Sequence, residues 1–408
     1  MWLYMKMAWR NVLRNKRRTL IAALAIGIGL GSMIFTDALI IGMKKGMIQS
    51  VTDTFLGDAQ IHRQNYRETR ENDLLVHRPA EVLARLAGDS RVRDFSPRVI
   101  SAGMISSPAN VSAVVVYGVD PAKERDLSEV DEYLQQGRYL EAGERGLIMG
   151  RHLADTLEVA LGERVVISLS KPESGDIVQQ LFKITGVFKM PVEELEKGTV
   201  FVPLTLVQEM LGIDDRYHEI AVKFRDPAYA YSEDETDFTR EYTTNQNEAV
   251  NWPELVPQMK MVLELSNLSL GIMGIIIFGV VVFGLINTLF MSLYERMFEF
   301  GVIRAIGTRA GGVRRLVMLE AAALGIISIL LGMAMGFLLT LVVTKTGIDY
   351  RGIEFAGSTF TKMLYPVMEW RQYILHPLMI FGFTLLVSIY PAVHAGRMKV
   401  ADALRRSL

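Results

Sequence analysis

The sequence predicts an α-helical membrane protein with four transmembrane helices and a large α+β extracytoplasmic domain inserted between the first and second helices. Two features of the 408-residue chain lead to this fold class. Half of the residues are hydrophobic, and the apolar ones concentrate in four long runs. A more polar segment of over two hundred residues separates the first run from the second, which is enough for a domain in its own right.

The four apolar runs have the length of transmembrane helices. At a rise of about 1.5 Å per residue, each run reaches roughly 30 Å or more, which is enough to cross the hydrocarbon core of a bilayer. The first run is longer than the apolar core of a secretory signal, so we interpret it as a retained anchor. Pro391 should bend or end the fourth run. The predicted transmembrane helices are 20–43, 268–291, 316–343 and 374–393.

Basic residues cluster beside these runs and predict the orientation of the chain. Lysine and arginine in short loops favour the cytoplasmic side, so both termini should be cytoplasmic in a multi-pass protein of the cell (inner) membrane. Residues 1–19, 292–315 and 394–408 are then cytoplasmic, whereas 44–267 and 344–373 lie outside or in the periplasm. The clusters are Lys6, Arg10, Arg14, Lys16, Arg17 and Arg18; Arg296, Arg304, Arg309, Arg314 and Arg315; and Arg397, Lys399, Arg405 and Arg406.

The extracytoplasmic segment 44–267 has a mixed pattern. Its β-branched runs alternate with short helical patterns, which is typical of an α+β domain. The acidic stretch Ser232–Asp237 is interpreted as a solvated loop rather than a ligand site. Segments 43–55 and 255–267 should continue the first two spans outward as helical stalk ends. The predicted strands are Val111–Gly118, Arg164–Leu169 and Leu181–Phe188, and the predicted helices are Ala80–Ala87, Arg151–Leu157 and Leu204–Leu211.

Composition and motifs exclude several classes of function. A net charge of −1 argues against a nucleic-acid-binding protein, and the absence of cysteine excludes disulfides and thiolate metal sites. The chain has no HExxH pair, no GxSxG turn and no Gly-Lys pair, so it lacks the signatures of a zinc protease, a serine hydrolase and a P-loop ATPase. We therefore predict no catalytic or metal residues, interpret the six scattered histidines as surface residues, and regard a membrane-anchored enzyme as poorly supported.

The connection between the second and third runs is charged and amphipathic. On a helix, its apolar stripe would lie in the membrane interface, while its charged side chains would meet water or a protein partner. Gly307 fits the end of this helix, and Thr308 can cap the next one. The alternative is a surface helix that touches anionic lipid headgroups. The stripe consists of Met297, Phe298, Val302 and Ile306, and the charged residues are Glu295, Arg296 and Glu299.

A few polar or small residues inside the runs are candidates for function, because polar groups are expensive in lipid. Asp37 lies late in the first run, where its side chain is expected to reach outward to the membrane interface rather than to line a path through the membrane. Asn287 and Thr288 lie late in the second run and could form hydrogen bonds between helices. The glycines Gly27, Gly29 and Gly31 permit close helix approach, as expected if the first span packs against a partner subunit.

Four stretches of the chain resemble signatures of the FtsX-like/MacB-type permeases of ABC transporters, which include the lipoprotein-releasing LolC/LolE permeases. In the most specific stretch, ERMFEFGVIRAIG resembles the signature ER-x-x-E-[IF]-G-[VI]-x-[RK]-A-[IL]-G. Two departures are Val400, where the family has proline, and Gly311–Gly312, which cost roughly 1 kcal/mol each relative to alanine in a helix. The four stretches are Ala8–Leu20, Met149–Ser168, Asn287–Arg309 and Tyr390–Arg406.

The resemblance implies a permease that binds no cofactor itself and works with a cytoplasmic ABC ATPase dimer, which holds ATP and Mg. It also implies a second permease copy or a sister permease, with the first two spans at the dimer interface or along the substrate path. The implied ATPase-coupling residues are Glu295, Arg296, Glu299, Gly301, Arg304 and Gly307; the implied membrane residues are Gly27, Gly31, Asp37 and Asn287.

The implied function is to extract or export a lipidic or lipid-anchored substrate, as in lipoprotein release. Two alternatives remain open. The first is a mechanotransmitting protein that activates an external hydrolase without transport. The second is export of a peptide or drug with a periplasmic adaptor or carrier. Homodimer and heterodimer are also both open.

Overall fold

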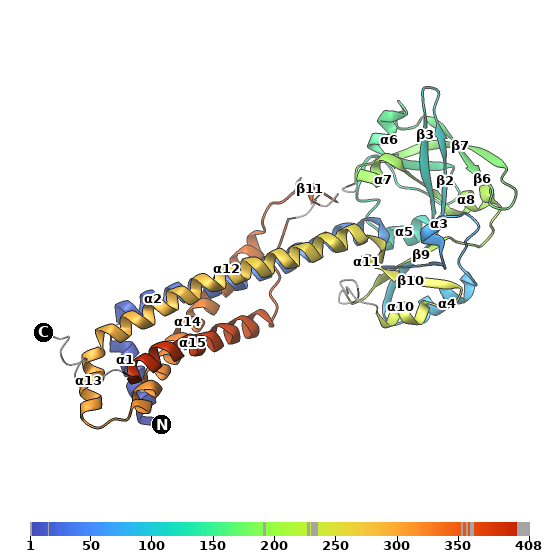
Figure 1. The fold of residues 1–408 in the computed structure, drawn as a ribbon. Coiled ribbons are helices and arrows are strands. Elements are labelled where there is room, and N and C mark those ends of the chain that lie inside the picture. The colour runs from blue at the N-terminus through green and yellow to red at the C-terminus, as the bar shows by residue number, and fades with distance from the viewer. Residues whose placement is uncertain are drawn as a thin grey trace. The chain divides into compact units, whose positions relative to one another are not determined.

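The computed structural model describes residues 2–14, 16–190, 193–226, 229, 236–351, 354–355, 358–359 and 363–397. Its contacts divide the chain into two units, which we describe separately (Figure 1). The helical unit comprises Met1–Lys44, Glu264–Asp349 and Met363–Leu408, and the mixed unit comprises Lys45–Leu263 and Tyr350–Lys362.

Long helices build the helical unit. Within the described residues, four helices are long and apolar enough to cross a membrane, and each contains one predicted span. The stalk ends are helical as predicted, because α2 continues to Val51 and α12 begins at Pro257. Pro391 lies inside α15, so the expectation that it could end this helix is wrong. The helices are α1 (Trp2–Arg14), α2 (Lys16–Val51), α12 (Pro257–Glu295), α13 (Met297–Ala305), α14 (Ala310–Thr346) and α15 (Gln372–Arg397).

Small residues bring α2 against α14 of the same chain. A Cβ atom added to Gly27 would lie 3.3 Å from the nitrogen of Gly332, and one added to Gly31 would lie 3.2 Å from the carbonyl oxygen of Gly332. The close helix approach expected at Gly27 and Gly31 is therefore present, but within the chain. This corrects the expectation that these glycines face a partner permease, because α14 already covers their side of the helix.

The mixed unit is built on one ten-stranded sheet among the described residues. Six of its strands close into a ring in the order β2, β3, β8, β5, β7, β6 and back to β2. The strands are β1 (Ala59–Arg63), β2 (Val92–Ser106), β3 (Val111–Val119), β4 (Leu134–Gly137), β5 (Gly146–Gly150), β6 (Arg164–Ser170), β7 (Ile177–Phe188), β8 (Thr199–Pro203), β9 (Glu219–Phe224) and β10 (Asn247–Asn251).

Strand β2 belongs to both halves of this sheet. Its first half, Val92–Arg98, pairs with β9, which continues the sheet through β1 to β10. Its second half, Gly103–Ser106, pairs with β6 and closes the ring. With fifteen residues, β2 is long enough to pair with different neighbours at its two ends, and the strand order of the sheet therefore branches at β2.

Short helices cover the two halves. All six predicted elements are present, although β7 begins at Ile177 rather than Leu181. The apolar core of the ring includes Val116, Ile167 and Phe182. A separate core around Phe238 lies between the β1–β9–β10 strands and their helices. A small pair of antiparallel strands, β11 (Glu354–Phe355) and β12 (Ser358–Thr359), also belongs to this unit. The helices of the unit are η1 (Thr52–Leu56, a π-helix), α3 (Tyr66–Thr69), α4 (Pro79–Gly88), α5 (Pro121–Leu127), α6 (Arg151–Thr156), α7 (Glu193–Gly198), α8 (Leu204–Leu211), α10 (Asp237–Tyr242) and α11 (Trp252–Leu255).

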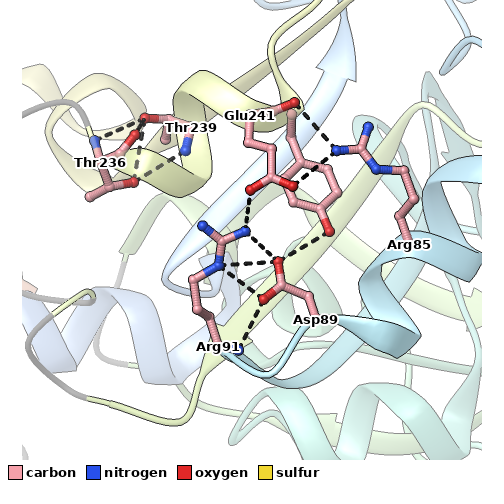
Figure 2. A network of polar contacts seen from close by, with 7 residues as sticks. Arg85, Asp89, Arg91, Thr236, Thr239 and Glu241 are labelled. Carbon is pink, nitrogen blue, oxygen red and sulfur yellow. Dashed lines mark hydrogen bonds and ion pairs between the residues drawn. The ribbon is translucent and has the colours of Figure 1, made fainter.

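An ion-pair network joins α4 to α10 at one edge of the mixed unit. Figure 2 shows Arg91 between Asp89 and Glu241, at 2.6 Å from an oxygen of each. Hydrogen bonds from Arg91 hold the pKa of Asp89 below its usual value. Of the acidic stretch predicted as a loop, residues 232–235 lie outside the described residues. Thr236 caps α10, and Asp237 begins it.

A buried arginine occupies the branch point of β2. Arg98 is fully buried and forms ion pairs at 2.6 Å with Glu124 of α5 and Glu219 of β9. It also donates a hydrogen bond to the carbonyl oxygen of Phe55 in η1, at 2.6 Å. Burial alone would lower the pKa of Arg98, but the two carboxylates raise it, so the guanidinium stays charged. Arg98 therefore ties η1, which directly follows α2, to both halves of the sheet.

Two histidines lie in the interior around this arginine. His62 is 2% exposed and lies 3.3 Å from the second oxygen of Glu219, while His218 is fully buried. Burial lowers the pKa of His218 to about 4, so its ring is neutral at pH 7. Hydrogen bonds link His218 to the nitrogen of Ile100 and the carbonyl of Asn72. The interpretation of the histidines as surface residues is wrong for these two, because both are buried in the core of the mixed unit.

Removing the buried charge should loosen the branch point. We expect Arg98→Met to lower the opening free energy of β2 and β9 amides by about 3–5 kcal/mol, because two carboxylates are left buried without a counter-charge. Hydrogen–deuterium exchange on the full-length protein measures this change residue by residue.

The control is Arg93→Met on the same strand, where the arginine pairs with Asp94 and is half exposed. An exposed pair contributes at most about 1 kcal/mol, so this variant should exchange nearly as the parent does. Equal protection in both variants would show that Arg98 does not hold the branch point.

Candidate functional site

The chain breaks and restarts its helix twice between α12 and α14. Arg296 leaves the helical conformation with φ −108° and ψ 13°, and α13 then runs from Met297 to Ala305. Gly307 has φ +106°, which few residues other than glycine adopt, and it ends α13 as predicted. The cap of α14 is Arg309, which makes no side-chain capping bond, so the expectation that Thr308 caps this helix is wrong. We call residues 295–309, from the last residue of α12 to the cap of α14, the elbow.

Five polar residues form a cluster that holds the elbow to its neighbours. Arg296 donates hydrogen bonds to both oxygens of Glu320 in α14, at 2.6 and 2.7 Å, and to Glu299 at 2.8 Å. Arg14 of α1 pairs with the other oxygen of Glu299 at 2.5 Å. Asn11 of α1 donates to Glu320 at 2.7 Å. We call these residues the elbow cluster; it joins α1, α13 and α14 through charge-assisted bonds.

The environment of the cluster favours the ionised forms of Arg296 and Glu299. Burial alone would lower the pKa of Arg296, but the hydrogen bonds and charge of Glu320 and Glu299 raise it overall. Burial alone would raise the pKa of Glu299, but hydrogen bonds from Arg296 and Arg14 lower it overall. Phe300 packs beneath the Arg296 guanidinium, 5.1 Å from its ring centre. Arg296 is therefore charged and largely buried, whereas its partner Glu299 and the Arg14 side chain remain partly exposed.

The structure divides the predicted coupling residues into three groups by their burial. Arg296 is only 8% exposed, so the expectation that it meets water is wrong, because Glu320 draws it inward. The predicted apolar stripe is also divided, since Met297 is buried whereas Ile306 is 82% exposed. The buried coupling candidates are Arg296 and Gly301, the half-buried ones are Glu299 and Arg304, and the exposed ones are Glu295 and Gly307.

Sequence reasoning missed Glu320 and Asn11. Glu320 is the only acidic residue between Ala310 and Thr346. An acid in an apolar span is expensive unless it is paired, so its position was a signal for a basic partner nearby. The partner could not be chosen from the sequence, because five arginines follow one another between residues 296 and 315.

An open polar hollow of about 530 Å³ lies beside the elbow. Gly312 explains one departure from the family pattern, because a Cβ atom there would lie 2.8 Å from the hydroxyl oxygen of Tyr4. Arg309 and Arg315 give the hollow a positive character. It is lined by Tyr4, Ile306, Gly307, Thr308, Arg309, Gly311, Gly312 and Arg315.

At the opposite end of the helical unit, Asp37 of α2 lies 3.1 Å from the Nε2 atom of His376 in α15. The sequence singled out Asp37 but gave it no partner among the scattered histidines.

Asn287 is exposed on α12, and it remains a candidate for the dimer interface. Lys399, Val400, Arg405 and Arg406 lie outside the described residues. Among the described side chains, no group of three or more acidic or imidazole residues is placed to hold a metal ion.

Comparison with known families gives two matches that together span most of the chain. Residues 19–231, more than half of the chain, match the MacB-like periplasmic core domain. Residues 271–400 match the FtsX-like permease C-terminal domain. The first match covers most of α2 and most of the mixed unit, and the second covers most of α12 together with the elbow, α14 and α15.

Individual relatives match along nearly the whole chain. The lipoprotein-releasing system transmembrane protein LolC of Xylella fastidiosa is 22% identical, covering 96% of this chain and 96% of the relative. LolE of Haemophilus influenzae is 21% identical, covering 97% and 98%. The macrolide export ATP-binding/permease protein MacB 1/2 of Paracoccus denitrificans is 24% identical, covering 82% of this chain and 50% of the relative. The crystal structure of the periplasmic region of MacB from Actinobacillus actinomycetemcomitans aligns with 53% of this chain at 14% identity and a TM-score of 0.35.

Loss of the central arginine should free the elbow. We expect Arg296→Met to destabilise the seating of α13 by on the order of 3 kcal/mol, since Glu320 is left in an apolar site without its arginine. Because the chain has no cysteine, a spin label on Phe298→Cys reports α13 alone, and its mobility should rise. Arg309→Met, which removes an exposed arginine of the same segment, should leave the spectrum unchanged. An unchanged spectrum in Arg296→Met would mean that the cluster does not hold α13.

Acid should weaken the link between α1 and α13. The pKa of Glu299 is lowered below its ordinary value of 4.5, so its contribution to stability is present above pH 4.5 and is lost as pH falls through the lower folded value. The same spin label should therefore become more mobile on acidification below about pH 4.5. In Glu299→Gln the label should be mobile already at pH 7 and insensitive to pH in this range. An acid response that persists in Glu299→Gln would assign it to another group.

Proposed function

Because this chain belongs to the FtsX-like permeases with a MacB-like periplasmic core domain, the non-catalytic membrane subunits of ABC transporters, we propose that it couples ATP hydrolysis on a separate ATPase subunit to extraction or export of a lipidic or lipid-anchored substrate. The elbow cluster is the observation that carries this proposal. A permease that receives force at a short helix needs that helix fixed to its membrane spans. Arg296 makes this connection through Glu320.

The ATPase supplies what this chain lacks. ATP and Mg would be bound by a cytoplasmic ABC ATPase dimer, and the present chain would bind no cofactor. The proposed contact surface consists of the exposed side of the elbow, including Glu295 and Gly307, with the basic hollow beside it. This requires the elbow and both termini to lie in the cytoplasm. The basic clusters on that side of the spans support this orientation.

Lipoprotein release is the substrate reaction we favour. Two permeases named for a lipoprotein-releasing system align with this chain almost from end to end. The MacB relative extends well beyond the chain, since half of its length is not covered. The transporter would act as a dimer with a second copy or a sister permease, and a periplasmic carrier or adaptor would receive the substrate.

Purification from native membranes with ATPase assay and mass spectrometry tests the proposal. A co-purified ABC ATPase together with an acylated protein or lipid supports it. An ATPase that arrives with a soluble hydrolase, and whose turnover that hydrolase stimulates, would instead identify a mechanotransmitting protein. The absence of any ATPase from the purified complex would refute the permease assignment of the elbow.

Charge reversal on the exposed side of the elbow should weaken the ATPase contact. We expect Glu295→Lys to reduce co-purification of the ATPase by roughly tenfold, equivalent to about 1.4 kcal/mol, because a rim charge then opposes its partner. Glu173→Lys is the matched control, since Glu173 is 82% exposed and lies in the periplasmic core domain. Equal recovery of the ATPase with both variants would contradict a contact at this side of the elbow.

A further inference from the structure

Asp37 and His376 form part of the wall of two cavities in the helical unit. The first cavity is mainly apolar, with a volume of about 110 Å³. It lies among α2, α12 and α15, at the end of the predicted spans away from the elbow. Its lining consists of Met33, Thr36, Asp37, Ile40, Leu270, Met273, Gly274, Ile277 and His376.

The second cavity shares Asp37 and His376 but is more polar. Its volume is about 350 Å³, and Glu369 and Arg371 approach it from the segment before α15. Its remaining lining residues are Ile41, Gln372 and Leu375. A molecule that occupied both cavities would therefore have an apolar part and a polar part, with the Asp37–His376 pair at the junction.

The chemistry of the Asp37–His376 pair indicates which polar group the bound molecule would carry. Asp37 is the only acidic residue among the first 52 of the chain. Its side chain is 40% exposed, and among the described residues it makes no ion pair with lysine or arginine; its partner is His376. The Nδ1 atom of His376 is buried without a partner in the described part of the chain. The Nε2 atom of His376 contacts one oxygen of the Asp37 carboxylate, and no hydrogen bond from the described residues reaches the other oxygen.

From this arrangement we infer that the Asp37–His376 site binds a cationic amphiphile with a single alkyl chain. The ammonium group pairs with the free side of the Asp37 carboxylate, where the apolar surroundings strengthen the attraction. The first carbons of the chain lie among the apolar side chains of α2 and α12. The apolar cavity, with a volume of about 110 Å³, is small, so it takes the first carbons of one chain. The inference deepens the broader part of the proposed function, on which it rests: it names a head-group preference for a lipidic substrate, and it does not depend on lipoprotein release.

The test uses the absence of cysteine. Met273→Cys, in the wall of the apolar cavity, is labelled with an environment-sensitive fluorophore, and the full-length protein is placed in nanodiscs of neutral lipid. Dodecyltrimethylammonium and the uncharged dodecanol are titrated in turn. We expect the cation to saturate the fluorescence change at a membrane concentration about tenfold lower than the alcohol does. Asp37→Asn, which keeps the size of the side chain and an acceptor for His376, should abolish this preference.

Glu264→Gln is the matched control, because it removes an exposed carboxylate from α12 outside both cavities. The preference for the cation should survive in this variant. A preference that persists in Asp37→Asn, or disappears equally in Glu264→Gln, would assign it to adsorption on the protein or bilayer surface and overturn the inference. Absence of any preference in the parent would also overturn it. No ATPase is needed for this binding, so its failure is distinguishable from failure of the permease assignment.

Discussion

A buried guanidinium must be held by carboxylates, and one such arginine organises each of the two units. Arg98 in the periplasmic core domain and Arg296 in the helical unit are both at most 8% exposed, and each pairs with two glutamates. A charge in an apolar site is tolerated only when its partners come close on several sides. Each arginine therefore fixes elements that the chain order keeps far apart, which an apolar contact of similar size would fix less specifically.

The two clusters fix short segments that lie next to long helices in the chain. Around Arg98, the segment that follows α2 is bound to the branch point of the sheet through the Phe55 carbonyl. Around Arg296, the elbow is bound to α1 and α14. Arg296 is thus a positioning residue, whereas Glu295 and the basic hollow offer the surface that a partner could touch. Asp37 stands apart from both, since its partner among the described residues is the histidine His376.

The errors of sequence reasoning have a common physical origin. The pattern of Gly27 and Gly31 predicted a close helix approach, but it could not identify the approaching helix. The charge of Arg296 predicted exposure, whereas Glu320, twenty-four residues later, supplied a partner that made burial possible. His62 and His218 were scattered in the sequence, and strand pairing carried them into one interior. In each case the deciding partner is distant along the chain.

The sequence by itself determined the four apolar spans, the inserted α+β domain, the short elbow between the second and third spans and the absence of a P-loop. These properties depend on local composition and periodicity, which a chain carries whatever its final contacts are. Only the tertiary structure decided which charges are paired and buried, which glycines are covered by α14, and that Asp37 meets His376. Those outcomes depend on distances between residues far apart in the chain, and burial of a charge is favourable or prohibitive according to the partner that folding brings within about 3 Å.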